Sequence, residues 1–261
     1  MSEKPQAVLI TGASSGLGAA LAKEYAKKGA FLYLNGRNDE RLNQVADECR
    51  TNGAAKVETY ICDVTDRENM KDWITKADSE HLLDICIANA GISGGTGDIE
   101  SSAVFNQAQK ILDVNVSGLM NTISPAGEKM RIRERGHIVI ISSLASFSPW
   151  PGAPAYAASK AAVRILGEAL IPNLKKKNIS LSVVCPGFVE TNMTAQNDFP
   201  MPFKWTSEKA ARKIIHGVQN KKEIIAFPIP LYVVIKMLSF LPLGIWWLLS
   251  SALPQKKGLK Y

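Results

Sequence analysis

The sequence predicts an α/β protein built as a Rossmann-like, doubly wound parallel sheet with helices on both faces. Two observations carry this prediction. Short apolar segments rich in valine and isoleucine alternate with longer segments of helical periodicity, and a glycine-rich turn follows the first apolar segment. Strands that are apolar throughout are expected to be buried on both faces, and each right-handed crossover between parallel strands places a helix over the sheet.

The expected elements follow one another from residue 7 onward. Strands are predicted at residues 7–10, 31–34, 57–61, 84–88, 137–142 and 180–185. Helices are predicted at residues 17–28, 39–52, 67–77, 103–133 and 155–176. Asp39 is interpreted as the N-cap of the second helix, because a short acidic side chain at that position accepts a hydrogen bond from the first helical turn. From Phe227 onward the composition changes.

Composition and charge exclude several classes of protein. With 261 residues, of which 46% are hydrophobic and 21% charged, the chain is long enough for one domain with a large core. The net charge of +7 is dispersed over short basic runs without interleaved aromatic residues, so nucleic acid is not an expected partner. An anionic cofactor or an anionic membrane surface explains the excess of basic residues more simply.

Metal binding and secretion are not expected either. The four cysteines lie far apart and in no metal-ligand spacing. His81, His137 and His216 have no carboxylate or cysteine partner at ligand spacing, so no metal site is predicted. The N-terminal segment runs directly into the first predicted strand without the pattern of a signal peptide. A cytoplasmic protein with reduced cysteines is therefore expected.

The glycine-rich turn between the first strand and the first helix contains Gly12, Gly16 and Gly18. Glycine allows a tight turn and lets backbone N–H groups approach a pyrophosphate at the N-terminus of a helix, where the helix dipole favours negative charge. Taken alone, the segment could also be a plain tight turn.

Together with Thr11, the turn has the pattern Thr-Gly-x-x-x-Gly-x-Gly, which resembles the cofactor loop of the short-chain dehydrogenase/reductase family. The resemblance covers about residues 6–227 and continues through Asn89, Asn115, Ser143, Tyr156, Lys160 and Pro186. It implies an NAD(P)-dependent oxidoreductase, commonly a homodimer or homotetramer, with Asp63 near the adenine ring and Asn89 supporting the central sheet. The cofactor-binding residues that it implies are Gly12, Ser14, Ser15, Gly16, Leu17, Gly18, Arg37, Asp63, Val64, Asn89, Ala90, Gly91, Tyr156, Lys160, Pro186, Gly187, Val189 and Thr191.

The same resemblance implies four catalytic residues: Ser143, Tyr156, Lys160 and Asn115. Tyr156 and Lys160 are four apart in a predicted helix, so their side chains project from one face. An adjacent ammonium favours the ionised phenol, and Tyr156 can then act as general base in oxidation or general acid in reduction. Ser143 is assigned to the substrate oxygen in preference to Ser142, because it lies thirteen residues before Tyr156. Asn115 is assigned to a water beside Lys160.

The end of the second strand bears on the choice between NAD and NADP. A carboxylate there would bind the ribose 2′-hydroxyl and repel a 2′-phosphate, whereas an arginine neutralises the phosphate. Gly36 stands where relatives that use NAD would carry the acid, and Arg37 follows it. NADP(H) is therefore the expected cofactor, with NAD(H) as the alternative if Arg37 is only a solvated surface charge.

By analogy with the family, residues 188–205 form the substrate lid. The large apolar residues of the lid are Met193, Phe199, Met201, Phe203 and Trp205. Leu144, Phe147 and Trp150, which follow the fifth strand, are considered with them. They indicate an apolar substrate pocket or, equally, packing against the C-terminal segment. The expected substrate is a lipophilic carbonyl or secondary alcohol, such as a steroid, a retinoid or a fatty-chain ketone. The alternatives are an NAD-dependent alcohol dehydrogenase of the same fold and a non-catalytic NADP-binding regulator or membrane scaffold.

Residues 1–227 are assigned to the dinucleotide-binding catalytic domain and residues 228–261 to an apolar helical extension. Residues 231–253 hold one charge, Lys236, and a proline and a glycine divide them into two pieces that are each too short to cross a bilayer. Two adjacent tryptophans and the lysines near the end of the chain suit a helix pair lying in one leaflet, which predicts peripheral, monotopic membrane contact. The alternatives are burial against the lid or a subunit partner, and a transmembrane helix.

Overall fold

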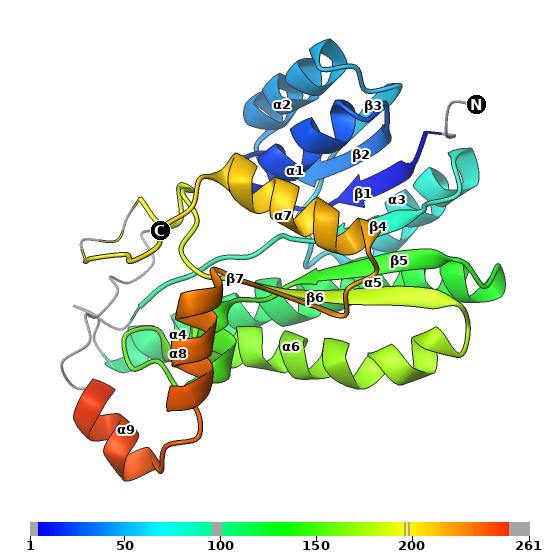
Figure 1. The fold of residues 1–261 in the computed structure, drawn as a ribbon. Coiled ribbons are helices and arrows are strands. Elements are labelled where there is room, and N and C mark those ends of the chain that lie inside the picture. The colour runs from blue at the N-terminus through cyan, green and yellow to red at the C-terminus, as the bar shows by residue number, and fades with distance from the viewer. Residues whose placement is uncertain (1–4, 96–100, 196, 198, 251–261) are drawn as a thin grey trace.

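The computed structural model describes residues 5–95, 101–195, 197 and 199–250, and in this part of the chain a seven-stranded parallel sheet lies at the centre (Figure 1). The strands are β1 (Ala7–Ile10), β2 (Phe31–Gly36), β3 (Lys56–Ile61), β4 (Ile85–Ala88), β5 (Gly136–Ile141), β6 (Ile179–Pro186) and β7 (Ile224–Phe227). Their order in the sheet is β3-β2-β1-β4-β5-β6-β7. The order reverses between β1 and β4, and such a reversal opens a crevice at the carboxyl ends of the two strands.

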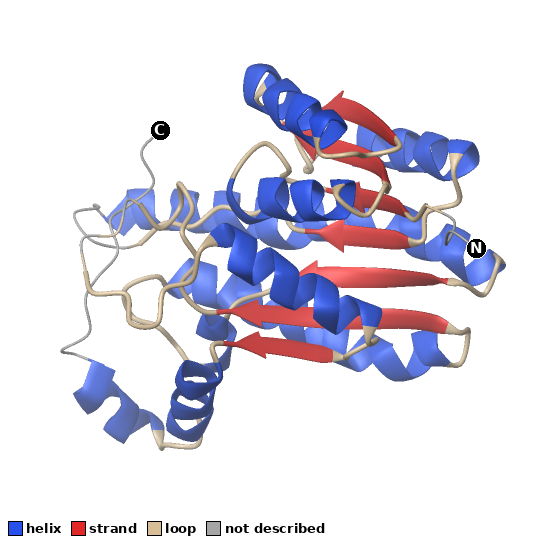
Figure 2. Ribbon diagram, turned by 45° about the horizontal axis from the view of Figure 1, so that its top comes forward, coloured by secondary structure: helices blue, strands red, loops and turns tan. Residues whose placement is uncertain are grey.

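Helices cover both faces of the sheet, as the alternation of apolar and periodic segments predicts (Figure 2). The α-helices are α1 (Gly16–Ala26), α2 (Asp39–Thr51), α3 (Arg67–Glu80), α4 (Ser101–Leu112), α5 (Gly118–Ile132), α6 (Pro154–Lys175), α7 (Ser207–Gln219), α8 (Ile229–Leu238) and α9 (Leu243–Ser250). A π-helical turn, η1 (Asp113–Ser117), and a 3₁₀ turn, η2 (Leu144–Phe147), complete the described elements.

Each strand supplies side chains to two separate cores, because successive residues of a strand point to opposite faces. In β1, Val8 and Ile10 pack in the core under α1, α2 and α7. Ala7 and Leu9 pack in the core under α3, α5 and α6. All four are at most 2% exposed. The doubly wound architecture predicted from the apolar strands is therefore confirmed.

The last strand of the sheet and the helix before it, β7 and α7, are not among the predicted elements. β7 is only four residues long and, unlike the equally short β1, is not followed by a glycine-rich turn, so periodicity alone does not distinguish it from a loop or a helix segment. In the structure its identity is decided by parallel pairing with β6, in which Ile224 lies opposite Val183 and Phe227 opposite Pro186.

The helix predicted over residues 103–133 is present, because residues 101–132 are helical without a break, but it is not a regular α-helix throughout. The π-helical turn η1 separates α4 from α5 and contains Asn115. A π-turn inserts one extra residue into a single turn of an α-helix, and no particular residue type marks the insertion. Hydrophobic periodicity along the sequence therefore does not reveal it.

The interpretation of Asp39 as an N-cap is also wrong, by one residue. Asn38 is the cap of α2: its backbone is extended and its side-chain oxygen accepts a hydrogen bond from the Arg41 N–H. Asparagine and aspartate cap helices about equally well, so residue type could not decide between the two positions. Asp39 lies instead in the first turn of α2.

The apolar C-terminal segment contains two short helices, α8 and α9. Pro230 lies in the first turn of α8, where the N–H that proline lacks would have no helical partner. Among the residues that the structure describes, no helix is both long and apolar enough to cross a membrane. Residues 251–261, which include the lysines on which the membrane prediction draws, lie outside the described residues.

Candidate active site

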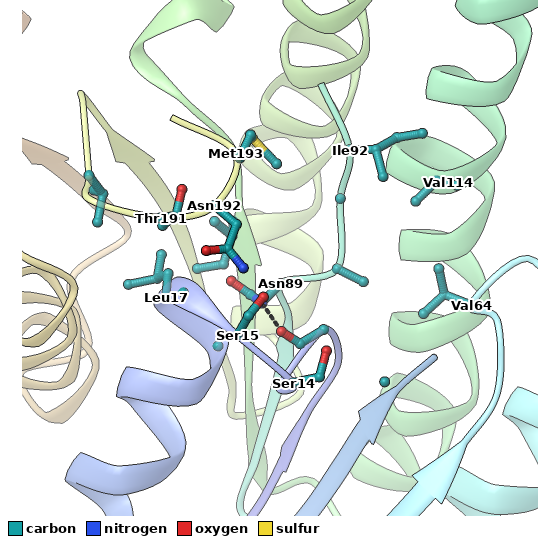
Figure 3. Close-up of a pocket in the computed structure, with 18 of the residues that line it drawn as sticks. Ser14, Ser15, Leu17, Val64, Asn89, Ile92, Val114, Thr191, Asn192 and Met193 are labelled. Carbon is teal, nitrogen blue, oxygen red and sulfur yellow. Dashed lines mark hydrogen bonds between the residues drawn. The ribbon is translucent and has the colours of Figure 1, made fainter. Parts of the chain in front are cut away.

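A cavity of about 590 Å³ opens at the carboxyl edge of the sheet, where β1 and β4 end. Figure 3 looks into it, with Leu17 and Thr191 on one side, Ile92, Val114 and Val64 on the other, and Asn192 and Met193 between them. Every residue predicted to bind the cofactor lines this cavity: Gly12, Ser14, Ser15, Gly16, Leu17, Gly18, Arg37, Asp63, Val64, Asn89, Ala90, Gly91, Tyr156, Lys160, Pro186, Gly187, Val189 and Thr191. Ser143 lines it as well, whereas Asn115 lies behind the lining and contacts Ile92.

The glycine-rich turn is held against β4 by Asn89. The side-chain amide of Asn89 donates hydrogen bonds to the carbonyl oxygens of Thr11 (2.9 Å) and Gly12 (3.2 Å), and the Thr11 hydroxyl accepts from the backbone N–H groups of Asn89 and Ala90. A Cβ added at Gly18 would collide with the Gly12 carbonyl oxygen and would lie 2.6 Å from the Asn89 amide nitrogen. The turn therefore needs glycine for close backbone packing.

The N-terminus of α1 faces this cavity and suits an anionic group. Ser15 occupies the N-cap position, and within the described chain its side chain makes no capping hydrogen bond. N–H groups in the first turn of a helix have no intrahelical partner, so those of α1 can donate to a ligand. Gly12 and Gly16 adopt positive φ angles of 65° and 55°, which bring the backbone close to the cavity. These features fit a pyrophosphate.

Arg37 lies at the end of β2 and pairs with Asp63, with 3.2 Å between Nη1 and Oδ2. Burial acts to raise the pKa of Asp63, but hydrogen bonds from Thr65 and the neighbouring Arg37 guanidinium outweigh it, and the pKa is lowered. Asp63 is therefore ionised at neutral pH and compensates part of the charge of Arg37. The Arg37 side chain is 59% exposed, so it remains accessible to an anion from solvent.

Two neighbours of Arg37 also bear on anion binding. Gly36 packs against Ser14, and a Cβ at Gly36 would lie 3.0 Å from the Ser14 Cβ, so the structure leaves little room for a carboxylate there. Arg41 lines the cavity too and was not predicted. It lies in the first turn of α2, four residues after Arg37, and a basic residue at that position is the signal that could have pointed to it.

Tyr156 lies in the first turn of α6 and is half-buried at the cavity wall. Burial raises the pKa of Tyr156, while a hydrogen bond with Ser143 acts in the opposite direction. Ser143 is the second residue after β5, and its Oγ also accepts a hydrogen bond from the Ala145 N–H at 3.1 Å. At neutral pH the raised pKa keeps the phenol protonated, so Tyr156 can donate a proton.

Lys160 lies one helical turn after Tyr156, and its ammonium is 5.9 Å from the centre of the Tyr156 ring. Its side chain is almost wholly buried, and Nζ donates to the carbonyl oxygen of Ile141 at 2.9 Å. Burial lowers the pKa of Lys160 to about 8. Ser142 donates to the Lys160 carbonyl oxygen at 2.8 Å and so joins α6 to β5. The Ser142 hydroxyl is therefore used in a contact between two elements of the fold, whereas the Ser143 hydroxyl hydrogen-bonds Tyr156.

Asn115 faces the same space as Lys160. Its side chain is buried and exchanges two hydrogen bonds with the backbone of Ile92, accepting at 2.8 Å and donating at 2.9 Å. A Cβ built on Gly91 would lie 3.1 Å from Asn115 Oδ1 and 3.3 Å from Lys160 Nζ. Because Gly91 has no side chain, a small space remains between the Asn115 side-chain oxygen, which can accept a hydrogen bond, and the Lys160 ammonium, which can donate one.

The predicted lid divides between cavity and core. Met193 lines the cavity, together with Asn192 and Thr194, two polar residues of the predicted lid that were not singled out from the sequence. Trp205 instead stacks on Phe227, with 4.9 Å between ring centroids, and pairs by backbone hydrogen bonds with the segment after β6. Only part of the lid's apolar surface therefore reaches the site. Gln196 and Asp198 lie outside the described residues.

The apolar residues near η2 face the C-terminal helices. Phe147 lies 5.5 Å from Tyr232 of α8 and 4.4 Å from the Arg164 guanidinium. The carbonyl oxygen of Pro149 accepts a hydrogen bond from the Trp246 indole at 2.9 Å. Of the two arrangements predicted for these apolar residues, Phe147 therefore adopts packing against the C-terminal segment.

The fold and the cavity together define a class of enzyme. A glycine-rich turn at the reversal of a doubly wound sheet suits a dinucleotide, and a serine, a tyrosine and a lysine meet beside it. Among the described residues, no group of three or more His, Cys, Asp or Glu side chains is placed to hold a metal ion. The class is that of NAD(P)-dependent oxidoreductases.

Comparison with known proteins identifies the family within this class. The family model described as short chain dehydrogenase matches residues 6–200, so the chain belongs to the short-chain dehydrogenase/reductase family. An uncharacterized oxidoreductase of Myxococcus xanthus is 36% identical over 90% of this chain and 92% of its own length. An uncharacterized oxidoreductase of Staphylococcus saprophyticus is 31% identical over 83% of this chain and 92% of its own.

Solved structures agree with this assignment. A putative NAD(P)-dependent gluconate 5-dehydrogenase from Beutenbergia cavernae, with NADP bound at low occupancy, superposes with a TM-score of 0.76 at 26% identity. The match covers 86% of this chain and 96% of that one. A short-chain type dehydrogenase/reductase from Mycobacterium marinum superposes with a TM-score of 0.74 at 26% identity, over 85% and 92% of the two chains. The predicted family, fold and enzyme class are confirmed.

Proposed function

We propose that this enzyme transfers hydride between NADP(H) and a lipophilic carbonyl or secondary alcohol, such as a steroid, a retinoid or a fatty-chain ketone. The observation that carries the proposal is the meeting of Ser143, Tyr156 and Lys160 in a cavity that Ile92 and Met193 also line. The polar groups suit one reacting oxygen, and the apolar side chains suit the hydrocarbon next to it.

In this proposal Tyr156 is the general acid of reduction. Bound nicotinamide supplies the hydride, or accepts it in the reverse direction. The protonated Tyr156 phenol donates its proton to the carbonyl oxygen as negative charge develops there, and the Ser143 hydroxyl hydrogen-bonds the same oxygen. The raised pKa of Tyr156 favours this direction, because it keeps the proton available at neutral pH.

Lys160 and Asn115 serve to return the proton. A Lys160 ammonium next to the phenol favours the phenolate that remains after proton donation. With a pKa of about 8, Lys160 can itself give up a proton near neutral pH. The space beside Gly91 could hold a water that accepts from Lys160 and donates to Asn115 Oδ1, which would connect the two side chains.

The preference for NADP(H) rests on Arg37 and Arg41, which line the cavity where β2 ends. Two guanidinium groups and no carboxylate at Gly36 favour a 2′-phosphate over a free 2′-hydroxyl. The NADP found in the Beutenbergia cavernae structure supports the same cofactor. The ion pair of Arg37 with Asp63 favours the alternative, an NAD-dependent alcohol dehydrogenase, because it already offsets one positive charge.

The direct test is a panel of carbonyls and alcohols, assayed with NADPH and NADP⁺ by the absorbance of the reduced nicotinamide. Turnover of lipophilic ketones or aldehydes in preference to small polar ones is expected. A protein that binds NADPH but turns over no member of the panel would instead support a non-catalytic NADP-binding scaffold. The expected homodimer or homotetramer remains a prediction that light scattering can check.

Replacing Arg37 with alanine should weaken NADPH binding selectively, since only NADPH carries the 2′-phosphate. A charge-assisted hydrogen bond of this kind contributes about 1.5 to 3 kcal/mol, or about 10- to 150-fold in Kd. Affinity for NADH should change little. Fluorescence titration of the reduced cofactors measures both constants.

Arg50→Ala is the matched control for this experiment. Arg50 lies in α2 as an ion-paired arginine with a side chain 52% exposed, close to the 59% of Arg37, but it does not line the cavity. It should leave both affinities near their wild-type values. If Arg37→Ala weakened NADPH and NADH equally, or if the wild-type enzyme preferred NADH, the assignment of NADP(H) would be wrong.

A further inference from the structure

Helices α8 and α9 carry an exposed apolar surface. Ten large apolar residues in residues 229–250 are each at least 47% exposed: Ile229, Val233, Val234, Met237, Phe240, Leu243, Ile245, Trp247, Leu248 and Leu249. They are more than half of the nineteen exposed large apolar residues in the described chain, so the exposure is concentrated in one short segment. Concentrated apolar surface of this kind marks a site of contact with a partner or a membrane.

The inner side of this helix pair is fixed to the catalytic domain. Trp246 is 5% exposed and its indole donates a hydrogen bond to the Pro149 carbonyl oxygen. Tyr232 meets the Phe147 ring edge-on, and the Lys236 ammonium lies 5.1 Å from the centre of the same ring. The outward apolar side chains are therefore presented from anchored helices.

The charged residues of the C-terminal segment are all basic. After Glu223 the sequence contains no aspartate or glutamate, and its charged residues are Lys236, Lys256, Lys257 and Lys260. At the base of α8, a surface pocket of about 250 Å³ brings Lys213, His216 and Lys222 next to Ile229 and Tyr232. The two lysines beside exposed apolar side chains are complementary to an anionic headgroup above its acyl chains.

The geometry of the helices excludes a bilayer-spanning role for them. At 1.5 Å per residue, α8 and α9 are roughly 15 and 12 Å long, about half or less of the hydrocarbon thickness. A surface helix, in contrast, needs only an apolar side and a charged margin. The described part of the chain provides both.

We propose that α8 and α9 dock this enzyme onto an anionic lipid bilayer, with their apolar side chains inserted into one leaflet. Both helices lie at the sheet edge toward which the strands point, the edge that holds the active-site cavity (Figures 1 and 2). Gly187 lines that cavity, and a Cβ there would lie 3.1 Å from Leu231 of α8. If the proposed function holds as well, a lipophilic substrate would reach the site from the membrane.

The test uses the full-length chain and does not depend on catalysis. Sedimentation with phosphatidylcholine vesicles, with or without phosphatidylglycerol, gives the bound fraction of wild type, Met237→Glu and Ile132→Glu. Met237 and Ile132 are 67% and 69% exposed, and both lie near the end of a helix, but Ile132 belongs to α5. Met237→Glu should lower the partition coefficient roughly tenfold or more, because it removes the burial of one large apolar side chain. Ile132→Glu should leave it unchanged.

Two further measurements separate the apolar and the electrostatic contributions. The double variant Lys213→Gln, Lys222→Gln should bind anionic vesicles more weakly and show no change on phosphatidylcholine alone. Added salt should have the same effect, because it screens charges outside the protein. Circular dichroism of each variant confirms that it is folded.

Three outcomes would overturn the proposal. Wild type could remain in the supernatant with every vesicle as a monodisperse oligomer, which would assign the apolar surface to a second copy of the chain. Met237→Glu and Ile132→Glu could reduce binding equally, which would mean that α8 has no special part. Finally, binding could be independent of phosphatidylglycerol, which would remove the electrostatic half of the inference.

Discussion

Replacing Tyr156 with phenylalanine should lower kcat by about 10² to 10⁴, the usual cost of losing a general acid. The substitution removes one hydroxyl and almost no volume, so the fold and the affinity for NADPH should stay near wild type. In the structure this hydroxyl is the group that Ser143 meets, in the cavity that also contains Lys160. The measurement is steady-state turnover of the best substrate of the panel, with NADPH affinity determined in parallel.

Tyr60→Phe is the matched control for this change. Tyr60 is also half-buried, but it lies in β3, where its ring stacks on Trp73 at 5.3 Å, away from the cavity. Its loss of a hydroxyl should leave kcat unaltered. A Tyr156→Phe enzyme with full kcat would show that another group donates the proton.

Replacing Gly18 with alanine should damage both stability and cofactor binding. The added methyl would collide with the backbone carbonyl of Gly12 and crowd the Asn89 side-chain amide, which its hydrogen bonds to the Thr11 and Gly12 carbonyl oxygens hold in place. Forcing one extra carbon into packed structure typically costs about 1 to 3 kcal/mol. For a domain of this size, each kcal/mol lowers Tm by about 2 to 4 °C. Thermal unfolding measures the stability, and titration with NADPH measures the effect on the turn.

Gly244→Ala tests whether the effect is specific to the turn. Gly244 is a helical glycine in α9, and a Cβ there would meet nothing within 4 Å in the described structure. Alanine has a higher helix propensity than glycine, so this variant should be as stable as wild type or slightly more stable. Equal stability of Gly18→Ala and Gly244→Ala would contradict the close packing of the turn.

Local patterns were sufficient for most of the fold and for the cavity lining. Apolar strands and amphipathic helices follow from residue periodicity, and the order of layers follows from the handedness of crossovers. The six predicted strands are all present within two residues of their expected bounds. Because parallel strands end at one edge of the sheet, residues just after them, such as Gly12, Asn89 and Ser143, meet there despite wide separation in the sequence.

Features that depend on contacts between distant segments could not be predicted in this way. Pairing with β6 makes β7 a strand, and the π-turn places Asn115 against Ile92. The ion pair between Arg37 and Asp63 likewise joins two segments that are far apart in the sequence, and no local pattern indicates that they lie close together.

The sequence by itself determined the class of the fold, the turn that suits a pyrophosphate, and the residue types at the site, because these depend on short-range periodicity and on side-chain chemistry. Only the tertiary structure decided how those groups are charged and which apolar residues remain exposed. Burial sets the pKa of Lys160 and of Tyr156, and packing on Phe227 withdraws Trp205 from the substrate region. The position of α8 leaves Met237 in solvent. Desolvation and exposure are properties of the surroundings of a side chain, and those surroundings come from parts of the chain that are far away in the sequence.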